Sequence, residues 1–334
     1  MTVDVLRRDW PWLNLPGLRY FGDDIYVTWP DISLKYDIVE YDSREDWTIF
    51  KDEYGTTKKT WRFKTASPLY LDPIVKSPQD FKEKVEPALD PADPRRASSS
   101  NYPFRHDLQK MIQERQQEFF VAVGVLGPWE YSAYLCGGLA KTLLFMMKNQ
   151  DFAGYMFSRI GEFLAAACQK YLEAGVDGIW MFEDQGSQDG PFFSPNLYAK
   201  LLKPAHEKVC EPFKKSGLPR LLHSDGRLEQ LIPHLLDAGF NALHPIQGKA
   251  GMQVKNLRDK YERLTLIGGI DTHVLSNGTF TEIEKEVKSK IQSAGQEGRY
   301  IVCSDGPVPP TVSMQNYTFF VKTLKKFGTY PLKI

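Results

Sequence analysis

The stretch LLHSDGRLEQLIPHLLDAGFNALHPIQ, residues 221–247, has an amphipathic segment between two short apolar ones. Apolar residues recur at intervals of three and four from Leu228 to Leu236, which is typical of a helix that packs on a sheet. Gly239 follows, at a position where glycine commonly ends a helix. The stretch therefore predicts a strand, a helix and a second strand, the unit from which parallel sheets are built.

The same alternation continues along the chain from about residue 117. Strands are predicted at 119–125, 178–182, 220–225, 242–246, 264–270 and 299–304. Two intervening helices have recognisable starts, at Ser194-Pro195 and at the capping pair Thr279 and Glu282. With one or two strands from the N-terminal segment, this α/β pattern predicts a (β/α)8 TIM-type barrel. An open doubly wound sheet is the alternative, although no Gly-x-Gly-x-x-Gly follows a predicted strand to support dinucleotide binding.

The N-terminal part of the chain has a different character. Twelve aromatic residues fall within the first 61, in short β-like segments such as IYVTW (25–29) and KTWRFK (59–64). A stretch at 81–103 alternates in charge and ends rich in proline and serine, which is typical of a loop or linker. We therefore expect an aromatic-rich N-terminal extension and linker at 1–103, packed on a barrel whose main part is 104–334.

Composition argues against several classes of protein. Lys+Arg and Asp+Glu number 42 each, so the formal charge is zero, which disfavours a nucleic-acid-binding protein. The longest apolar run, 119–127, is too short to span a membrane, and residues 1–12 contain no apolar signal core. Four widely spaced cysteines show no metal-ligand spacing. The sequence predicts a cytoplasmic protein that binds neither nucleic acid nor membrane, and it leaves homo-oligomer formation open.

Polar residues follow five consecutive predicted strands, at the ends where barrels of this type carry their active sites. In chain order they are Glu183, Asp184 and the nearby Gln188; His223 and Asp225; His244 and Gln247; Asp271 and His273; and Asp305. Five such ends directed toward one mouth predict a site. Simpler alternatives stay open: Asp225 and Asp271 could cap the helices that follow them, and Trp180 could be a core residue. His206 is expected on a polar face, with no role.

Several linked stretches carry a family resemblance: EDQGSQDGPFFSPNLYAKLLKPAH (183–206), the opening stretch, LIGGIDTHVLSNGT (266–279) and YIVCSDGPVPPTVSMQNY (300–317). Together they resemble the uroporphyrinogen decarboxylase superfamily, and within it the corrinoid-dependent methyltransferases and O-demethylases. The resemblance covers about residues 118–325 and implies a (β/α)8 barrel with its site at the mouth. The arginine-rich segment with which the decarboxylases bind an acidic tetrapyrrole is missing, which argues against porphyrinogen decarboxylation.

The thiol-methylating relatives hold zinc through His-x-Cys and a distant cysteine, and the matching residues here are His223, Asp225 and Asp305. Imidazole and carboxylates make a harder zinc site than thiolates do, which suits activation of an ether oxygen. The resemblance thus implies a methyltransferase that moves a methyl group from a small methoxylated, aromatic substrate to a corrinoid carried by a partner protein. A decarboxylase or lyase, a thiol methyltransferase, and a non-catalytic barrel that binds a ligand or corrinoid are the alternatives.

The expected roles of the residues follow from this interpretation. The expected Zn²⁺ ligands are His223, Asp225, Glu183 and Asp305. The expected catalytic residues are His223, Asp184 and Asp305. The expected substrate-binding residues are Gln188, His244, Gln247, Asp271, His273 and Trp180.

Overall fold

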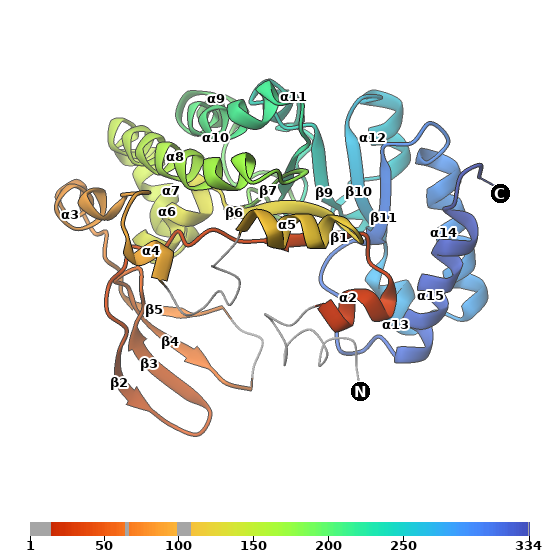
Figure 1. The fold of residues 1–334 in the computed structure, drawn as a ribbon, viewed down its shortest axis with the longest axis horizontal. Helices are drawn as coiled ribbons and strands as arrows, with labels where there is room; N and C mark the ends of the chain where they lie inside the picture. The colour runs from red at the N-terminus through yellow and green to blue at the C-terminus, as the bar shows by residue number, and fades with distance from the viewer. Residues whose placement is uncertain (1–14, 64–66, 99–107, 333) are drawn as a thin grey trace.

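The computed structural model describes residues 15–63, 67–98, 108–332 and 334. Its centre is a parallel sheet of seven strands whose spatial order follows their order in the chain (Figure 1). The strands are β1 (Ile25–Thr28), β6 (Phe120–Leu126), β7 (Gly178–Phe182), β8 (Arg220–His223), β9 (Ala242–Ile246), β10 (Thr265–Ile270) and β11 (Tyr300–Ser304). A doubly wound sheet reverses its strand order at a switch point, so this order excludes that alternative.

The predicted closed barrel of eight strands is corrected to a curled sheet of seven. Within the described residues, β1 and β11 are the two edges and do not pair with each other. Side chains from the segments next to these two edge strands contact each other instead. Phe21, at the end of α2 (Leu15–Phe21), lies edge-to-face on Tyr317, with ring centroids 4.8 Å apart. The concave face has its own buried cluster, formed by Ala122, Trp180, Leu221, Ala242 and Ile267. As in a barrel, the interior is packed and the carboxyl ends of the strands share one rim.

Helices cover the outer face of the sheet (Figure 1). From α5 onward the helices are α5 (Leu108–Gln116), α6 (Pro128–Cys136), α7 (Leu139–Lys148), α8 (Gln150–Glu173), α9 (Pro195–Leu201), α10 (Lys203–Lys215), α11 (Ile232–Asp237), α12 (Val254–Lys260), α13 (Thr272–Asn277), α14 (Phe280–Ala294) and α15 (Met314–Phe327), with a 3-10 turn at Gly248–Ala250. Of these, α5, α8, α10, α12 and α14 contact the strands directly, whereas α7 and α13 pack mainly on other helices. The predicted cap at Ser194 and the capping box of Thr279 and Glu282 are both confirmed. No helix in the described part of the chain is long and apolar enough to cross a membrane.

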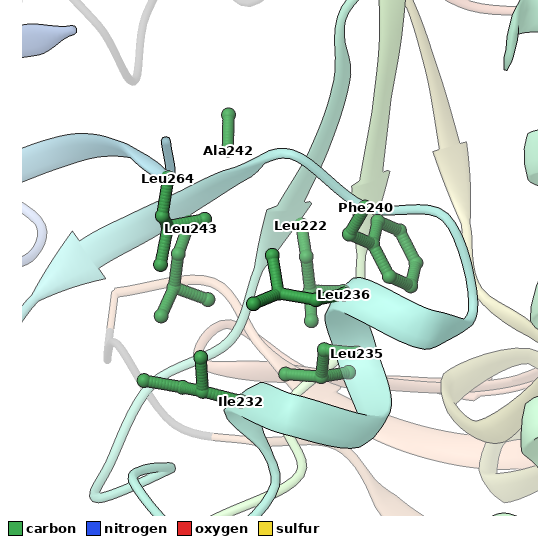
Figure 2. A pocket seen from close by; sticks show the side chains of 8 residues that line it. All are labelled: Leu222, Ile232, Leu235, Leu236, Phe240, Ala242, Leu243 and Leu264. Carbon is green, nitrogen blue, oxygen red and sulfur yellow. The ribbon is translucent and has the colours of Figure 1, made fainter. Parts of the chain in front are cut away.

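The helix predicted from residue 228 begins later, at Ile232. Its apolar residues nevertheless pack on the sheet as expected: Ile232 and Leu235 are buried close to Leu222 of β8 and Leu243 of β9 (Figure 2). A cavity of about 10 Å³ remains between them, and its lining side chains are all apolar. Its lining offers a water molecule no hydrogen-bond partner. The predicted helix–sheet contact is therefore confirmed, with a shorter helix.

The N-terminal segment contributes to two sheets. β1 belongs to the large sheet, and an antiparallel sheet follows, made of β2 (Val39–Ser43), β3 (Trp47–Lys51), β4 (Thr57–Trp61) and β5 (Leu69–Asp72). Short helical segments lead on toward α5: α3 (Pro78–Asp80), a π-helical turn (Phe81–Val85), a 3-10 turn (Glu86–Ala88) and α4 (Arg95–Ser98). The division of the chain at residue 103 stays a prediction.

The small sheet is attached to α6 by aromatic and charged side chains. The Tyr54 ring lies 5.6 Å from that of Tyr131 and 5.4 Å from that of Tyr134. Lys58 is buried, with its Nζ 2.8 Å from Asp52 and 3.1 Å from the Tyr134 hydroxyl. A buried ion pair with a further hydrogen bond is costly to break, so this contact fixes where the small sheet docks.

Candidate functional site

A row of rings crosses three neighbouring strands at their carboxyl ends. The parallel register places Phe182 of β7 beside His223 of β8, and His223 beside His244 of β9. The ring centroids are 5.3 Å apart in the first pair and 4.9 Å apart in the second. Alternate residues of a strand face the same side, so this ring row shares the concave face with the buried Trp180 and Leu221. It lies on the inner wall at the rim of the sheet.

His223 and His244 share one hydrogen bond, between Nδ1 atoms 2.7 Å apart, so one ring donates and the other accepts. Burial lowers the pKa of both rings, and for His244 the neighbouring His223 adds to this effect and brings the pKa to about 3. Both imidazoles are therefore neutral near pH 7. When His223 donates from Nδ1, its Nε2 presents a lone pair on the side of Asp184, whose Oδ1 is 3.7 Å away.

Asp184, His223 and Asp225 form a compact Asp–His–Asp group. Each offers one ligand atom, and these atoms all lie within 4.8 Å of one another. The backbone amide of Asp225 donates to Asp184 Oδ1 at 2.9 Å, and Gln247 Nε2 donates to Asp225 Oδ1 at 3.0 Å. Burial and then the charge of Asp184 raise the pKa of Asp225, so part of this shift comes from the closeness of the two carboxylates. A cation bound here would relieve that repulsion.

Asp225 does not cap the following helix. The N-cap of α11 is Leu231, several residues later, and it makes no side-chain cap bond. The chain instead turns at Gly226, where φ is +91° and an added Cβ would lie 2.5 Å from the backbone of Gly186. Ser224 Oγ accepts from Gln185 N at 2.8 Å and joins the same two loops. These contacts hold Asp225 at the rim beside Asp184.

Glu183, a predicted metal ligand, is directed away from the Asp–His–Asp group. Successive residues of an extended chain point to opposite sides, so Asp184 faces the rim while Glu183 faces the helices. Its carboxylate is 1% exposed and accepts from Trp129 N at 3.0 Å and from Gln185 Nε2 at 2.6 Å. It also contacts Nε2 of His206. The buried carboxylate is thus occupied by protein donors and does not join the group.

His206 is fully buried, so its placement on a polar face was wrong. It lies on α10, and its Nδ1 is 2.8 Å from the hydroxyl of Tyr198 on α9. Glu183, His206 and Tyr198 together form a buried chain that links the end of β7 to two helices. The apolar pattern of α10 could have indicated that His206 is buried. Val209 and Cys210, three and four residues further on, lie on the same helix face and are buried apolar residues.

Asp305, predicted as both ligand and catalytic residue, also lies outside the group. It is fully buried, and its Oδ1 accepts from the backbone amide and the hydroxyl of Thr272 at 3.2 and 3.1 Å. Its other oxygen is buried without a hydrogen-bond partner among the described residues. Asp305 still acts on the group through its charge, which contributes to the raised pKa of Asp225.

The predicted substrate-binding residues divide into two sets. His244 and Gln247 contact the Asp–His–Asp group as described, and Trp180, 9% exposed, lies below the ring row. Asp271, by contrast, caps α13 by accepting from His273 N at 2.7 Å, so its capping alternative is confirmed. The His273 and Gln188 side chains are exposed and make no hydrogen bond to the group among the described residues.

Glu130 is a residue of this region that was not singled out from the sequence. It lies in the first turn of α6, next to Trp129, whose Nε1 donates to the carbonyl of Asp184 at 2.6 Å. Burial, followed by the charges of Asp184 and Glu183, raises the pKa of Glu130 to about 7. The strand predicted at 119–125 ends just before it, so the rule applied to the other strand ends would have found this carboxylate as well.

His244 should make the free energy of unfolding depend on pH. In the unfolded chain the ring binds a proton below its ordinary pKa near 6.5, whereas the folded ring stays neutral down to about 3. The stabilisation is therefore complete above pH 6.5 and is lost as the pH falls from there toward 3. Glu130 acts in the opposite direction, since its folded pKa is raised to about 7, so a variant is needed to isolate the histidine.

In urea titrations, the stability difference between the wild type and His244→Gln is expected to shrink by about 1 kcal/mol per pH unit between about pH 6 and pH 4. A difference that stays constant over this range would contradict a neutral His244.

Individual known proteins resemble this chain in their three-dimensional structure more than in their sequence. No curated protein matches its sequence. A methyltransferase from Methanosarcina mazei superposes with a TM-score of 0.67 and 16% identity, covering 95% of this chain and 84% of its own. A sugar phosphate isomerase/epimerase from Parabacteroides distasonis reaches a TM-score of 0.33 and 12% identity, covering 76% of this chain and 91% of its own, which is too dissimilar to guide an argument. At 16% identity the first similarity shows a common fold.

The sequence model of one family, described as uroporphyrinogen decarboxylase (URO-D), matches residues 61–327. This match spans well over half of the chain and includes all the strand ends that form the candidate site. The chain belongs to the uroporphyrinogen decarboxylase family.

Proposed function

We propose that this protein is a methyltransferase that moves a methyl group from a small methoxylated aromatic substrate to a corrinoid carried by a partner protein. The observation that supports this proposal is the Asp–His–Asp group at the rim of a fold shared with a methyltransferase. One imidazole nitrogen and two carboxylate oxygens form a donor set that Zn²⁺ accepts, and their closeness to one another fits a single ion. Such a set favours an oxygen-containing substrate over a thiol.

Removing a methyl group from an ether is difficult because the oxygen is a poor leaving group. Zn²⁺ held by Asp184, His223 and Asp225 would supply a Lewis acid that stabilises the charge developing on that oxygen. The residues of the chain prepare this site. His244 orients the His223 ring through the shared hydrogen bond, in which His223 would donate from Nδ1 when its Nε2 binds the ion, and Gln247 orients Asp225.

Methyl transfer to free cob(I)alamin tests the proposal. The Zn²⁺-loaded protein should methylate the corrinoid when given anisole or 1,2-dimethoxybenzene, followed by the change in corrinoid absorbance, and His223→Ala should abolish the transfer. His273→Ala, which alters an exposed histidine, is the matched control and should remain active. Failure with every methyl donor, together with CO₂ release from a carboxylated substrate, would replace this proposal by a decarboxylase.

A further inference from the structure

Aromatic side chains extend the ring row into the interior and along the rim. Phe182 is adjacent to Trp180 on the same strand and to Trp29, which directly follows β1. The ring centroids are 5.4 Å and 4.9 Å apart, with interplanar angles of 19° and 37°. Phe182 also lies 5.3 Å from His223, at 36°. The rings are far from perpendicular to one another, and at these distances they stack, so they form one aromatic stack that ends at a member of the Asp–His–Asp group.

Trp29 is held in this place by its neighbours. β6 runs between β1 and β7, and an added Cβ at its Gly124 would lie 3.0 Å from two ring carbons of Trp29 and 2.5 Å from Val27. The glycine therefore makes room for the indole. The Tyr171 hydroxyl of α8 donates to the Trp29 carbonyl at 2.8 Å, which fixes the backbone. The Trp29 and Phe182 side chains are nevertheless only partly buried, so both can contact a ligand.

Trp180 adds an independent indication of a ligand. Its Nε1 is buried and has no hydrogen-bond partner among the described residues. A buried indole N–H normally finds an acceptor, because leaving it unpaired costs free energy. The nitrogen has almost no exposed surface, so an oxygen atom of a bound ligand, or a water that accompanies it, would satisfy this donor once the side chains that cover it shift on binding.

We propose that Trp29 and Phe182 form the binding surface for the aromatic ring of the substrate, and that Trp29 determines the preference for aryl over saturated ethers. This inference rests on the proposed function, because it places the ring beside the group that would activate the ether oxygen. Aromatic rings stack on one another in offset arrangements with centroids about 4.5–7 Å apart, so the aromatic ring of the substrate can extend this stack at the partly exposed Trp29. A quaternary ammonium ion prefers rings that enclose it as a cage, and these rings stack on one another instead.

Calorimetric titration of the Zn²⁺-loaded protein with anisole tests this inference without any methyl transfer. Trp29→Leu is expected to weaken anisole binding about tenfold, while Trp29→Phe keeps a ring and most of the affinity. Cyclohexyl methyl ether, a saturated ligand of similar size, should bind the wild type more weakly and should be little affected by Trp29→Leu. Trp47→Leu, in the small sheet, is the matched control and should leave anisole binding unchanged. Gly124→Ala, which crowds the indole, supplies a second variant if Trp29→Leu does not fold.

Several results would overturn the inference. These are the absence of anisole binding to the wild type, equal affinity of folded Trp29→Leu, and tighter binding of tetramethylammonium or the saturated ether than of anisole. Failure of the proposed function gives a different pattern: anisole binding would depend on Trp29, but cob(I)alamin would not be methylated. Conversely, if Trp29→Leu methylated the corrinoid as well as the wild type and bound anisole with unchanged affinity, the proposed reaction would stand and the proposed role of Trp29 would be wrong.

Discussion

The His223→Ala variant is expected to bind Zn²⁺ more than about 100-fold more weakly than the wild type, because loss of a residue that merely orients a ligand already costs about 10–100-fold. His223 is the nitrogen donor of the Asp–His–Asp group, and the variant would leave two carboxylates without it. Competition with a chromophoric chelator measures the affinity. The absorption spectrum of the Co²⁺-substituted protein reports separately whether a nitrogen ligand has been lost.

Two further variants show whether the effect is specific. His273→Ala removes an exposed histidine and should bind Zn²⁺ as the wild type does. His244→Gln removes the partner of His223 Nδ1 and should fall between the two, about 10–100-fold weaker than the wild type. If His223→Ala retained full affinity, the ion would have to bind elsewhere and the proposed zinc site would be wrong.

His206→Gln is expected to lower the free energy of unfolding by about 1.5–3 kcal/mol, because it removes a hydrogen-bonding partner of a buried carboxylate. His206 and Glu183 are 0% and 1% exposed, so the remaining carboxylate cannot turn to water. Urea unfolding at constant pH measures the loss. Because Glu183 directly precedes Asp184, the variant should also bind Zn²⁺ less tightly while still folded.

Tyr198→Phe provides a graded comparison for this buried chain. It removes one hydroxyl from His206 Nδ1 and keeps the ring, so a loss of about 1 kcal/mol is expected. If His206→Gln cost no more than Tyr198→Phe, the contact with Glu183 would contribute little to stability. If the Zn²⁺ affinity of His206→Gln equalled that of the wild type, Asp184 would be positioned independently of Glu183.

The strands of the large sheet were predictable because each is a short apolar run bounded by polar residues. All six strands predicted between 119 and 304 are present at nearly the same positions. The start of α11 was not predictable in this way, since the spacing of Leu228 and Leu231 fits a helix, yet both are buried before the helix begins. The turn at Gly226 packs on the loop around Gly186, which is distant in sequence and invisible to a local pattern. The absence of pairing between β1 and β11 in the described structure was not predictable for the same reason, since it depends on segments far apart in the sequence.

The polar strand ends were predictable, but their grouping was not. Glu183 and Asp184 are adjacent and chemically similar, and only the phase of β7 decides which one faces the rim. The contact between His223 and His244 depends on the register of β8 against β9, and register is a property of the assembled sheet. The sequence therefore identified the candidate residues, while the pairing of strands decided which of them meet.

The end of β7 gives three successive residues three different neighbourhoods: Phe182 lies in the ring row, Glu183 among the helices and Asp184 in the Asp–His–Asp group. Inserting or deleting one residue here would reverse the facing of all that follow, and so would disrupt all three at once. Substitution of Trp29, which lies at the end of a different strand, would change the ring that packs on Phe182 but not the direction in which these three residues face. We therefore expect the substrate range of this fold to change through substitutions of the aromatic rings, such as Trp29. Insertions and deletions at residues 182–184 are expected to be excluded.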